Sequence, residues 1–306
     1  GTTDNDWYDY ISARGLDEVN FWQPSATPPF TNALIGLPFL FKLRRPNNHI
    51  AGGGFFVTYS RLPISVAWDV FGEKNGAASL ADFYELLGPL NRQRLDGEVG
   101  CTVLTNVSFL PREHWISDPV GWSPNIVRGK MYESTTETGD ALWREFSARR
   151  NAVESQLLPK VADEREKYGT PILVKPRIGQ SSFRVLVTDA YKRRCAMTGE
   201  NTLIAHEAAH IVPYSTEGTH DVSNGLLLRA DFHKLFDVGL VSVSPDLRIK
   251  VSPRIREAYF NGKAYYRLDN RRLLSPIYRN IARIQTVSIG TCKTASRVEV
   301  SHGIDK

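Results

Sequence analysis

Cysteine is scarce in this chain, long apolar runs are missing, and neither sign of charge dominates. The 306 residues include only Cys101, Cys195 and Cys292, which lie far apart and form neither a disulfide framework nor a four-cysteine zinc site. No apolar run approaches the ~18 residues of a membrane-spanning helix, and the polar, acidic start (GTTDNDWYDY) is not a signal peptide. The sequence therefore predicts a cytoplasmic protein with reduced thiols and no membrane partner.

The small net charge of +5 is unevenly distributed along the chain. Residues 1–175 hold 18 Lys and Arg against 21 Asp and Glu, whereas residues 176–306 hold 20 against 12. With 42% hydrophobic content, the chain is long enough for two domains that each have a core. The basic second half suits a phosphate-rich partner, because cationic groups release counterions from nucleic acid. A solvated basic surface is the alternative.

The polar residues with the most informative spacing lie between residues 195 and 240. His210, Asn224 and His233 follow one another at gaps of 14 and 9 positions. The apolar segment around His210 (LIAHEAAHIV) predicts a short strand. A turn signal, Asn224-Gly225, precedes residues that are spaced as in a helix: Leu226, Leu227, Ala230 and Phe236. We therefore expect one histidine on a strand and the other on a helix reaching from Asn224 to Phe236.

Three phrases in this stretch, EAAHIVPYS, DVSNGLLLR and FHKLFDVGL, resemble one bacterial branch of the HNH nuclease family. The resemblance covers roughly residues 183–255 and implies a ββα unit that holds one divalent metal ion. It implies that His210 is the general base, that His233 is a metal ligand, and that Asn224 holds the loop and the base in place. The chemistry agrees: an imidazole can take a proton from water, and a divalent cation can neutralise charge and carry the leaving oxygen.

The second metal ligand is less well defined, because Ala209 stands where many family members have Asp or His. Glu207 lies on the same side of a strand as position 209 and has a longer side chain. Asp237 lies one helical turn from His233, although it could instead satisfy backbone donors near a helix end. We do not expect His206 and His220 to be metal ligands, since most isolated histidines are ordinary surface or loop residues.

The expected cofactor is one divalent metal ion, by default Mg²⁺. Mn²⁺, Co²⁺ or Ni²⁺ can substitute, since a site that contains histidine accepts several ions. Some HNH modules also carry a structural zinc on paired CxxC motifs. Ala196, Met197 and Thr198 follow Cys195, so no such pair exists and no structural zinc is expected.

The first 135 residues predict a mixed sheet with small helices. Strand patterns occur in FLFKL and in VGCTVLTNVSFL, a short helix is expected within residues 1–20, and Ser79 is a suitable N-cap for another. A glycine triplet, residues 52–54, is expected between a loop and a strand, where it permits positive φ or the close approach of another backbone.

These patterns resemble PUA-like domains that are fused to HNH modules in bacterial modification-dependent restriction enzymes. PUA-like folds include the SRA and EVE domains, which read modified bases by taking the base out of the duplex. Such a pocket needs stacking faces and a few polar groups. The candidates are Trp22, Phe55, Phe56, Tyr59 and Trp68, with Ser60 and Asp69 as polar partners. The alternative for each aromatic residue is a place in the core.

Residues 136–175 read as a charged helical connector, and residues 176–306 as the nuclease domain. In the latter, Ser181 or Ser182 is expected to cap a helix from Phe183 to Arg194. Two hairpins are expected, one around Pro245-Asp246 and one at Asn261-Gly262. The expected phosphate contacts are arginines near the end of the chain, Arg271, Arg272 and Arg279, with a merely exposed position as the alternative.

Taken together, the sequence predicts an α+β protein with a PUA-like β-barrel or sheet domain, a helical connector and a ββα-metal HNH nuclease domain. The predicted function is a modification-dependent endonuclease that cuts double-stranded DNA with modified cytosine. One active-site motif per chain suggests a homodimer for double-strand breaks. The alternatives are an inert DNA-binding protein, which Ala209 favours, and a nuclease that acts on RNA or on unmodified DNA.

Overall fold

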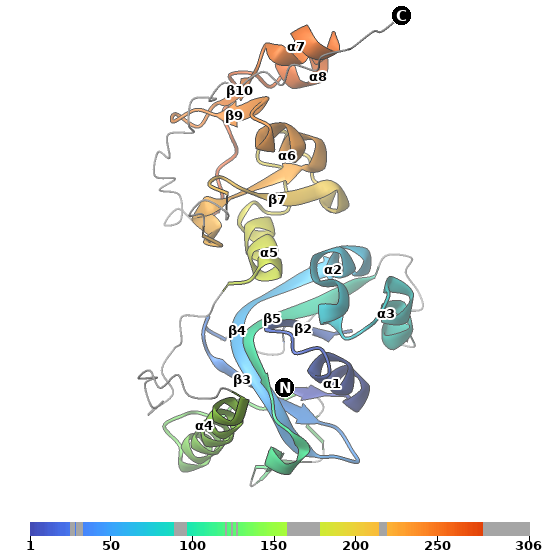
Figure 1. Ribbon diagram of the computed structural model, residues 1–306, viewed down its shortest axis with the longest axis vertical. Helices are drawn as coiled ribbons and strands as arrows, with labels where there is room; N and C mark the ends of the chain where they lie inside the picture. The colour runs from blue at the N-terminus through green and yellow to red at the C-terminus, as the bar shows by residue number, and fades with distance from the viewer. Residues whose placement is uncertain are drawn as a thin grey trace, which may run out of the picture. The chain divides into compact units, whose positions relative to one another are not determined.

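The computed structural model describes two compact units, Gly1–Leu186 and Val187–Lys306 (Figure 1). The boundary falls inside helix α5 (Gln180–Ala190). The described residues are 1–24, 28, 33–88, 97–119, 121–123, 125–126, 128–157, 178–213 and 219–277. Within them, no helix is long and apolar enough to cross a membrane.

A six-stranded mixed sheet forms the centre of the first unit, which confirms the expected mixed α+β character. Its strands run in the order β1-β3-β4-β5-β2, with β6 paired to β4. The β1–β3 pair is parallel and the other pairs are antiparallel. Between the described strands no pair closes the sheet into a barrel. The strands are β1 (Thr2–Thr3), β2 (Glu18–Gln23), β3 (Pro38–Leu43), β4 (His49–Pro63), β5 (Glu98–Phe109) and β6 (Ile116–Ser117).

The glycine triplet lies inside β4 and not before a strand as expected. A Cβ atom on Gly52 would approach the Ser108 carbonyl oxygen to 2.5 Å, and one on Gly53 would approach the Phe39 carbonyl oxygen to 2.8 Å. The pairing of β4 with β5 also shifts register on both sides of Phe55. The glycines therefore allow close backbone approach, and none of the three has a positive φ.

Short helices of the first unit begin largely where the sequence placed them. Asp4 caps α1 (Asn5–Ser12), and Ser79 caps α3 (Leu80–Leu87) by accepting from the Asp82 amide. The remaining helices of this unit are α2 (Ile64–Phe71), the 3₁₀ turns Gly72–Asn75 and Arg112–His114, and α4 (Glu137–Leu157).

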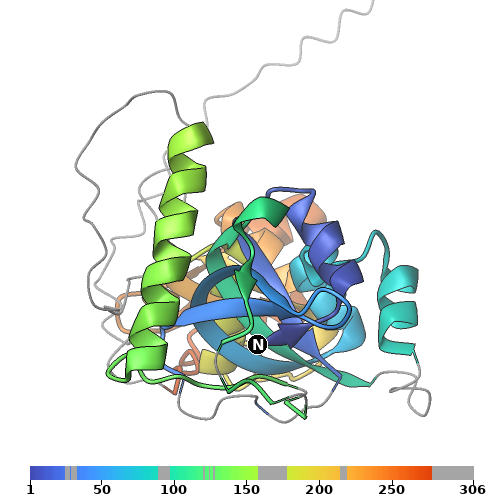
Figure 2. The ribbon, with the colours of Figure 1, turned by 90° about the horizontal axis from the view of Figure 1, so that it is seen from below.

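Two apolar clusters lie on the two faces of the sheet, one under α1 and one under α4 (Figure 2). Trp7 and Ile11 of α1 pack with Phe56 in the first cluster, and Trp143 of α4 packs with Phe55 in the second. Helix α4 comes from the predicted connector, so this part of the connector contributes to the core of the first unit. The rest of that connector, residues 158–175, lies outside the described residues.

The first turn of α5 is anchored by a buried carboxylate of the first unit. Helix α5 begins at Gln180, three residues before the predicted start at Phe183. Ser181 and Ser182 therefore lie in its first turn, where their amides donate to Glu18. Lys74 approaches the same carboxylate to 2.7 Å. Glu18, not a serine, satisfies this helix N-terminus.

The second unit contains two short strand pairs and small helices. Strands β9 (Val241–Val243) and β10 (Ile249–Val251) form an antiparallel hairpin around Pro245-Asp246, as predicted. The other elements are the 3₁₀ turns Leu203–Ala205 and Val222–Asn224, β7 (His206–His210), β8 (Gly225–Arg229), α6 (Ala230–Asp237), α7 (Arg254–Tyr259) and α8 (Lys263–Tyr266).

Two predictions in this unit are wrong. The helix expected from Asn224 to Phe236 is a strand in its first part, because residues 225–229 pair with β7, and it becomes helical only at Ala230. The second hairpin expected at Asn261-Gly262 is a helix start. Gly262 has a φ of +116° and is the N-cap of α8.

Candidate active site

A strand pair followed directly by a helix carries the two predicted histidines. Strands β7 and β8 are antiparallel, with His206 opposite Arg229 and His210 opposite Gly225. Helix α6 begins at Ala230, immediately after β8, and carries His233. This strand–strand–helix arrangement places His210 at the end of β7 and His233 within α6.

Asn224 joins the two ends of the loop that follows His210. Its Oδ1 accepts from the Val212 amide at 2.8 Å, and its Nδ2 donates to the carbonyl oxygens of Val212 at 3.0 Å and Thr219 at 2.9 Å. The Asn224 carbonyl also accepts from the Ile211 amide. These bonds correspond to the loop-holding role that the resemblance implied for this side chain.

The imidazole of His210 lies against a second imidazole. Nε2 of His210 is 3.1 Å from Nδ1 of His220, and the ring centroids are 5.2 Å apart. Burial lowers the pKa of His210. The charges of His220 and His233 lower this pKa further, whereas Asp237 raises it. His210 is therefore biased toward the neutral form that can accept a proton. His220 directly precedes the motif DVSNGLLLR, and that position is the one signal that could have selected it.

His233 stands between two carboxylates. Its Nδ1 lies 2.6 Å from Glu207 Oε2, and its Nε2 lies 3.4 Å from Asp237 Oδ2. Both carboxylates that are candidate metal ligands therefore lie beside His233, but they contact different nitrogens of its ring. In the described part of the chain, no three His, Cys, Asp or Glu side chains converge on one point as ligands would. Imidazole and carboxylate are nevertheless suitable donors for a divalent cation, and Glu207, His233 and Asp237 would hold it.

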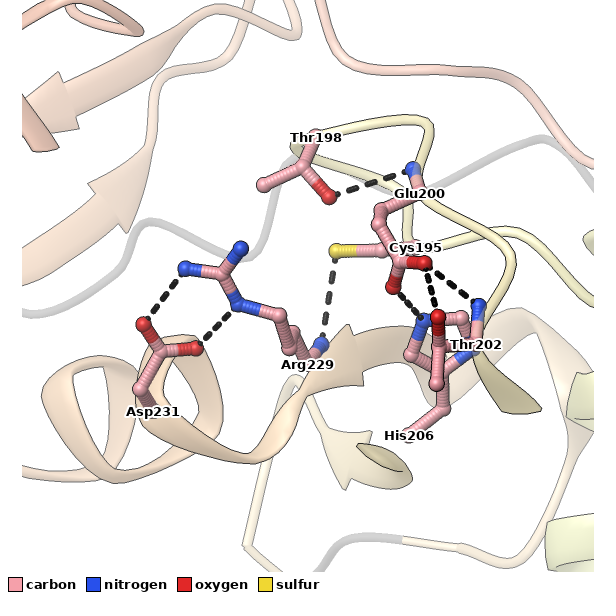
Figure 3. A network of polar contacts seen from close by, with 7 residues as sticks. All are labelled: Cys195, Thr198, Glu200, Thr202, His206, Arg229 and Asp231. Atoms are coloured by element: carbon pink, nitrogen blue, oxygen red, sulfur yellow. Dashed lines mark hydrogen bonds and ion pairs between the residues drawn. The ribbon is translucent and has the colours of Figure 1, made fainter. Parts of the chain in front are cut away.

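A separate polar network joins this strand pair to the preceding loop (Figure 3). Nε2 of His206 lies 3.2 Å from a Glu200 oxygen, so this histidine is used away from His210 and His233. Buried Cys195 accepts through Sγ from the Arg229 amide at 3.3 Å. The Arg229 guanidinium in turn makes two 2.7 Å bonds to Asp231. The network fixes the junction between β8 and α6, the helix that carries His233.

The six residues predicted to form a base pocket are not brought together. Trp22 lines a cavity at the end of β2, whereas Phe55 is buried under α4. Tyr59 packs on the α1 cluster, and Ser60 is buried. Trp68 contacts Phe83, and Asp69 pairs with Arg184. Phe56, the seventh candidate, lines a different cavity, which borders α4.

The arginines proposed as phosphate contacts lie near the end of the described chain. Arg271 and Arg272 are exposed, and Arg272 bridges to Arg248 through the backbone. Arg279 lies outside the described residues. Their role in binding DNA stays a prediction.

Comparison with known proteins locates one family in this region. Residues 195–244 match the family described as HNH endonuclease. No curated protein matches the chain. Among solved structures, a tyrosine-to-phenylalanine mutant of ZmASCH from Zymomonas mobilis aligns over 46% of this chain and 93% of its own, with 9% identity and a TM-score of 0.35, which carries no argument about fold. The family match supports an HNH nuclease domain in this chain, which is therefore a phosphodiester hydrolase.

Proposed function

We propose that this protein is a modification-dependent DNA endonuclease. In this proposal residues 1–135 read a modified cytosine in double-stranded DNA, residues 136–175 connect the domains, and residues 176–306 cut the strand. The observation that carries the proposal is the grouping of His210, Asn224 and His233 within the segment that matches the HNH family. The basic charge of the second half, with 20 Lys and Arg against 12 Asp and Glu, supports a nucleic-acid substrate.

The proposed reaction begins at His210. Its neutral imidazole takes a proton from a water molecule as the water oxygen bonds to the phosphorus atom. The bond from phosphorus to the 3′ oxygen then breaks, which leaves a 5′-phosphate and, after protonation, a 3′-hydroxyl. Glu207, His233 and Asp237 would hold a divalent cation, which when bound would neutralise charge at the phosphate and at the leaving oxygen. Asn224 keeps the loop after His210 closed, so the base stays at the end of β7.

One structural observation favours a second candidate function, an inert DNA-binding protein. Ala209 provides no ligand, and no cage of three metal-binding side chains is preformed in the described residues. In that case the ββα unit would bind the phosphate backbone without hydrolysing it.

The test is cleavage of one plasmid prepared unmodified, with 5-methylcytosine and with 5-hydroxymethylcytosine, each with Mg²⁺ and with Mn²⁺. We expect selective cutting of a modified form and a loss on the order of 10²- to 10⁴-fold in His210→Ala, as for other general bases. Equal cutting of all three plasmids would contradict modification dependence. Cutting by His210→Ala at the wild-type rate would contradict the assigned base, and no cutting with either metal would favour the inert protein. A structured RNA in the same assay tests the RNA alternative.

A further inference from the structure

A cavity lies where the first and last strands of the central sheet meet. Strands β1 and β2 are the two ends of the strand order, yet both border this one cavity of about 520 Å³. Pockets of a few hundred Å³ are typical of small-molecule sites and occur at the mouths of curved sheets. The described lining comes from β1, α1, β2 and five further positions, and it includes Thr2, Trp7, Trp22, Gln23, Arg44 and Arg128.

Three lining side chains, Thr2, Trp7 and Gln23, carry buried polar atoms that have no hydrogen-bond partner among the described residues. Gln23 is only 8% exposed, and its Oε1 accepts no bond. Thr2 Oγ1 is likewise buried without a partner. A buried polar atom without a partner is costly, so each such atom in a native protein calls for an explanation. At the wall of a cavity, a ligand that supplies the missing partner is one explanation.

The aromatic walls of this cavity are held rigidly. Trp7 makes edge contacts with Phe21 at 5.4 Å and with Phe41 at 5.5 Å between ring centroids. Nε1 of Trp22 donates to the Asn75 carbonyl at 2.7 Å, and the ring contacts Phe83. Such fixed faces suit a flat ring, because little side-chain entropy remains to be lost on binding.

The charges around this cavity favour a ligand attached to phosphate. Arg44 and Arg128 line it and are both exposed residues. The one carboxylate in the lining, Asp4, is already used, because it accepts from the Trp7 amide at 2.8 Å as the N-cap of α1. The cavity thus combines a neutral, partly apolar interior with two guanidinium groups that can pair with phosphates.

A second cavity of similar size, beside α4, differs in chemistry. It is lined by Phe39, Phe56, Tyr132 and Trp143 among others, and its buried cation is Lys42. The Lys42 ammonium already contacts Asp118 at 3.1 Å, the Leu43 carbonyl and Asn48. No arginine lines this cavity among the described residues. Tyr132 and Trp143 of this cavity also carry buried polar atoms without a described partner, so the two cavities differ mainly in their arginines. The cavity beside α4 therefore serves as an internal control.

We propose that the cavity bordered by β1 and β2 binds the extruded base of a nucleotide in DNA. Gln23 Oε1 accepts from an amino group of the base, as an N4 amino group of cytosine would supply, and the Thr2 hydroxyl bonds to a neighbouring polar atom of the ring. Arg44 and Arg128 contact the flanking phosphates. This inference rests on the proposed base-reading function and moves the pocket away from six of the seven residues that the sequence suggested.

The experiment measures binding of the full chain, in EDTA so that no cleavage occurs, to fluorescent duplexes with one cytosine, one 5-methylcytosine or one 5-hydroxymethylcytosine. The test variants are Gln23→Leu and Thr2→Val, and the control is Tyr132→Phe in the cavity beside α4. We expect each test variant to weaken binding of the preferred modified duplex ~10-fold, in line with the loss of one buried hydrogen bond. Binding of the unmodified duplex and binding by Tyr132→Phe should stay as in the wild type.

Unchanged modified-base preference in Gln23→Leu and Thr2→Val would overturn the assignment while leaving the base-reading function intact. So would a loss of preference in Tyr132→Phe alone. A wild type that binds all three duplexes equally would overturn both the base-reading function and this inference. Thermal melting checks each variant. If Gln23→Leu does not fold, Thr2→Val decides, since it is an isosteric change in a partly exposed, two-residue strand.

Discussion

Neighbouring residues change the pKa of the His210 imidazole, and one of them is His220, which lies 3.1 Å away. Burial lowers the His210 pKa, and a positive charge on His220 lowers it further. A general base works only when neutral, so activity is present above the His210 pKa and is lost as pH falls through it. Replacing His220 by alanine removes one cause of the lowering. We therefore expect the acid limb of the pH–rate profile for cleavage to move to higher pH in His220→Ala.

The control for this shift is His114→Ala, which removes a histidine from the other unit and should leave the acid limb in place. A merely structural role of His220 would lower the rate at every pH without moving the limb. An unmoved limb in His220→Ala would therefore show that His220 does not tune the base.

Two similar Glu–His pairs involve a residue of β7, and metal affinity should depend on only one of them. Glu207 lies 2.6 Å from His233, whereas Glu200 lies 3.2 Å from His206 on the opposite side of the strand. We expect Glu207→Gln to weaken Mn²⁺ binding on the order of 10- to 100-fold, as carboxylates around metal-binding histidines do. Glu200→Gln should leave it unchanged. Calorimetric titration of both variants measures this, and equal affinities would remove Glu207 from the site.

At the scale of single residues, the sequence points to candidate site residues where they belong to a recognisable motif. His210, Asn224 and His233 were selected that way, and the structure places the first at a strand end and the last on a helix. His220 was passed over, because its contact with His210 arises only when Asn224 closes the loop between them. The base-pocket residues are predicted from aromatic faces with nearby polar groups, a pattern that core packing also produces, and the structure distributes them over several places.

Among the structural elements, the loop after His210 depends most on a single side chain. Asn224→Ala removes three hydrogen bonds that join Val212 and Thr219. We expect faster hydrogen exchange at the Val212 amide, a loss of about 1–3 kcal/mol in local stability for the groups left unpaired, and slower cleavage. Asn224→Asp keeps the acceptor for the Val212 amide and should have an intermediate effect. Exchange at the wild-type rate in Asn224→Ala would contradict this role.

The junction between Glu18 and α5 should make the first unit sensitive to acid. Burial raises the pKa of the Glu18 carboxyl, but Lys74 and the Ser182 hydrogen bonds outweigh burial and hold the pKa below its ordinary value. The stabilisation is therefore fully present above the ordinary pKa of 4.5 and is lost as pH falls through the lower, folded-state pKa. We expect Glu18→Gln to cost about 3 kcal/mol at pH 7, as when one partner of a buried ion pair is removed.

Urea unfolding at neutral and at strongly acidic pH measures this effect. The difference between wild type and Glu18→Gln should shrink in acid, where the wild-type carboxyl is protonated. Asp69→Asn is the matched control, because its pair with Arg184 also involves α5 but is exposed, and such pairs contribute at most about 1 kcal/mol. A constant difference at both pH values would show that the charge of Glu18 is not what stabilises the junction.

Two element boundaries could not be predicted from local sequence patterns. The apolar run Gly225–Leu228 fits a buried strand as well as a helix, and the deciding factor was pairing with β7, which lies some distance back along the chain. Asn261-Gly262 is a common hairpin signal, yet Gly262 uses its positive φ to start α8. In contrast, Ser79 and the Pro245-Asp246 turn were predicted correctly, because caps and tight turns depend on adjacent residues.

At the scale of the whole molecule, one chain carries one ββα unit and hence one site for one strand. We therefore expect the wild type to convert supercoiled plasmid first to the nicked form and only later to the linear form. If two chains act together on modified DNA, the rate of linearisation should rise more steeply than in proportion to enzyme concentration, whereas the nicking rate should rise in proportion.

Gel analysis of the three plasmid forms over a range of enzyme concentrations separates these cases. Mixing wild type with an excess of His210→Ala provides the control: mixed dimers cut one strand, so nicked plasmid should accumulate while linear product falls. Linear product that appears without a nicked intermediate, at a rate proportional to the concentration of a chain shown to be monomeric, would contradict the one-site, one-strand model. It would require a single chain to present its His210 site to both strands in turn before releasing the DNA.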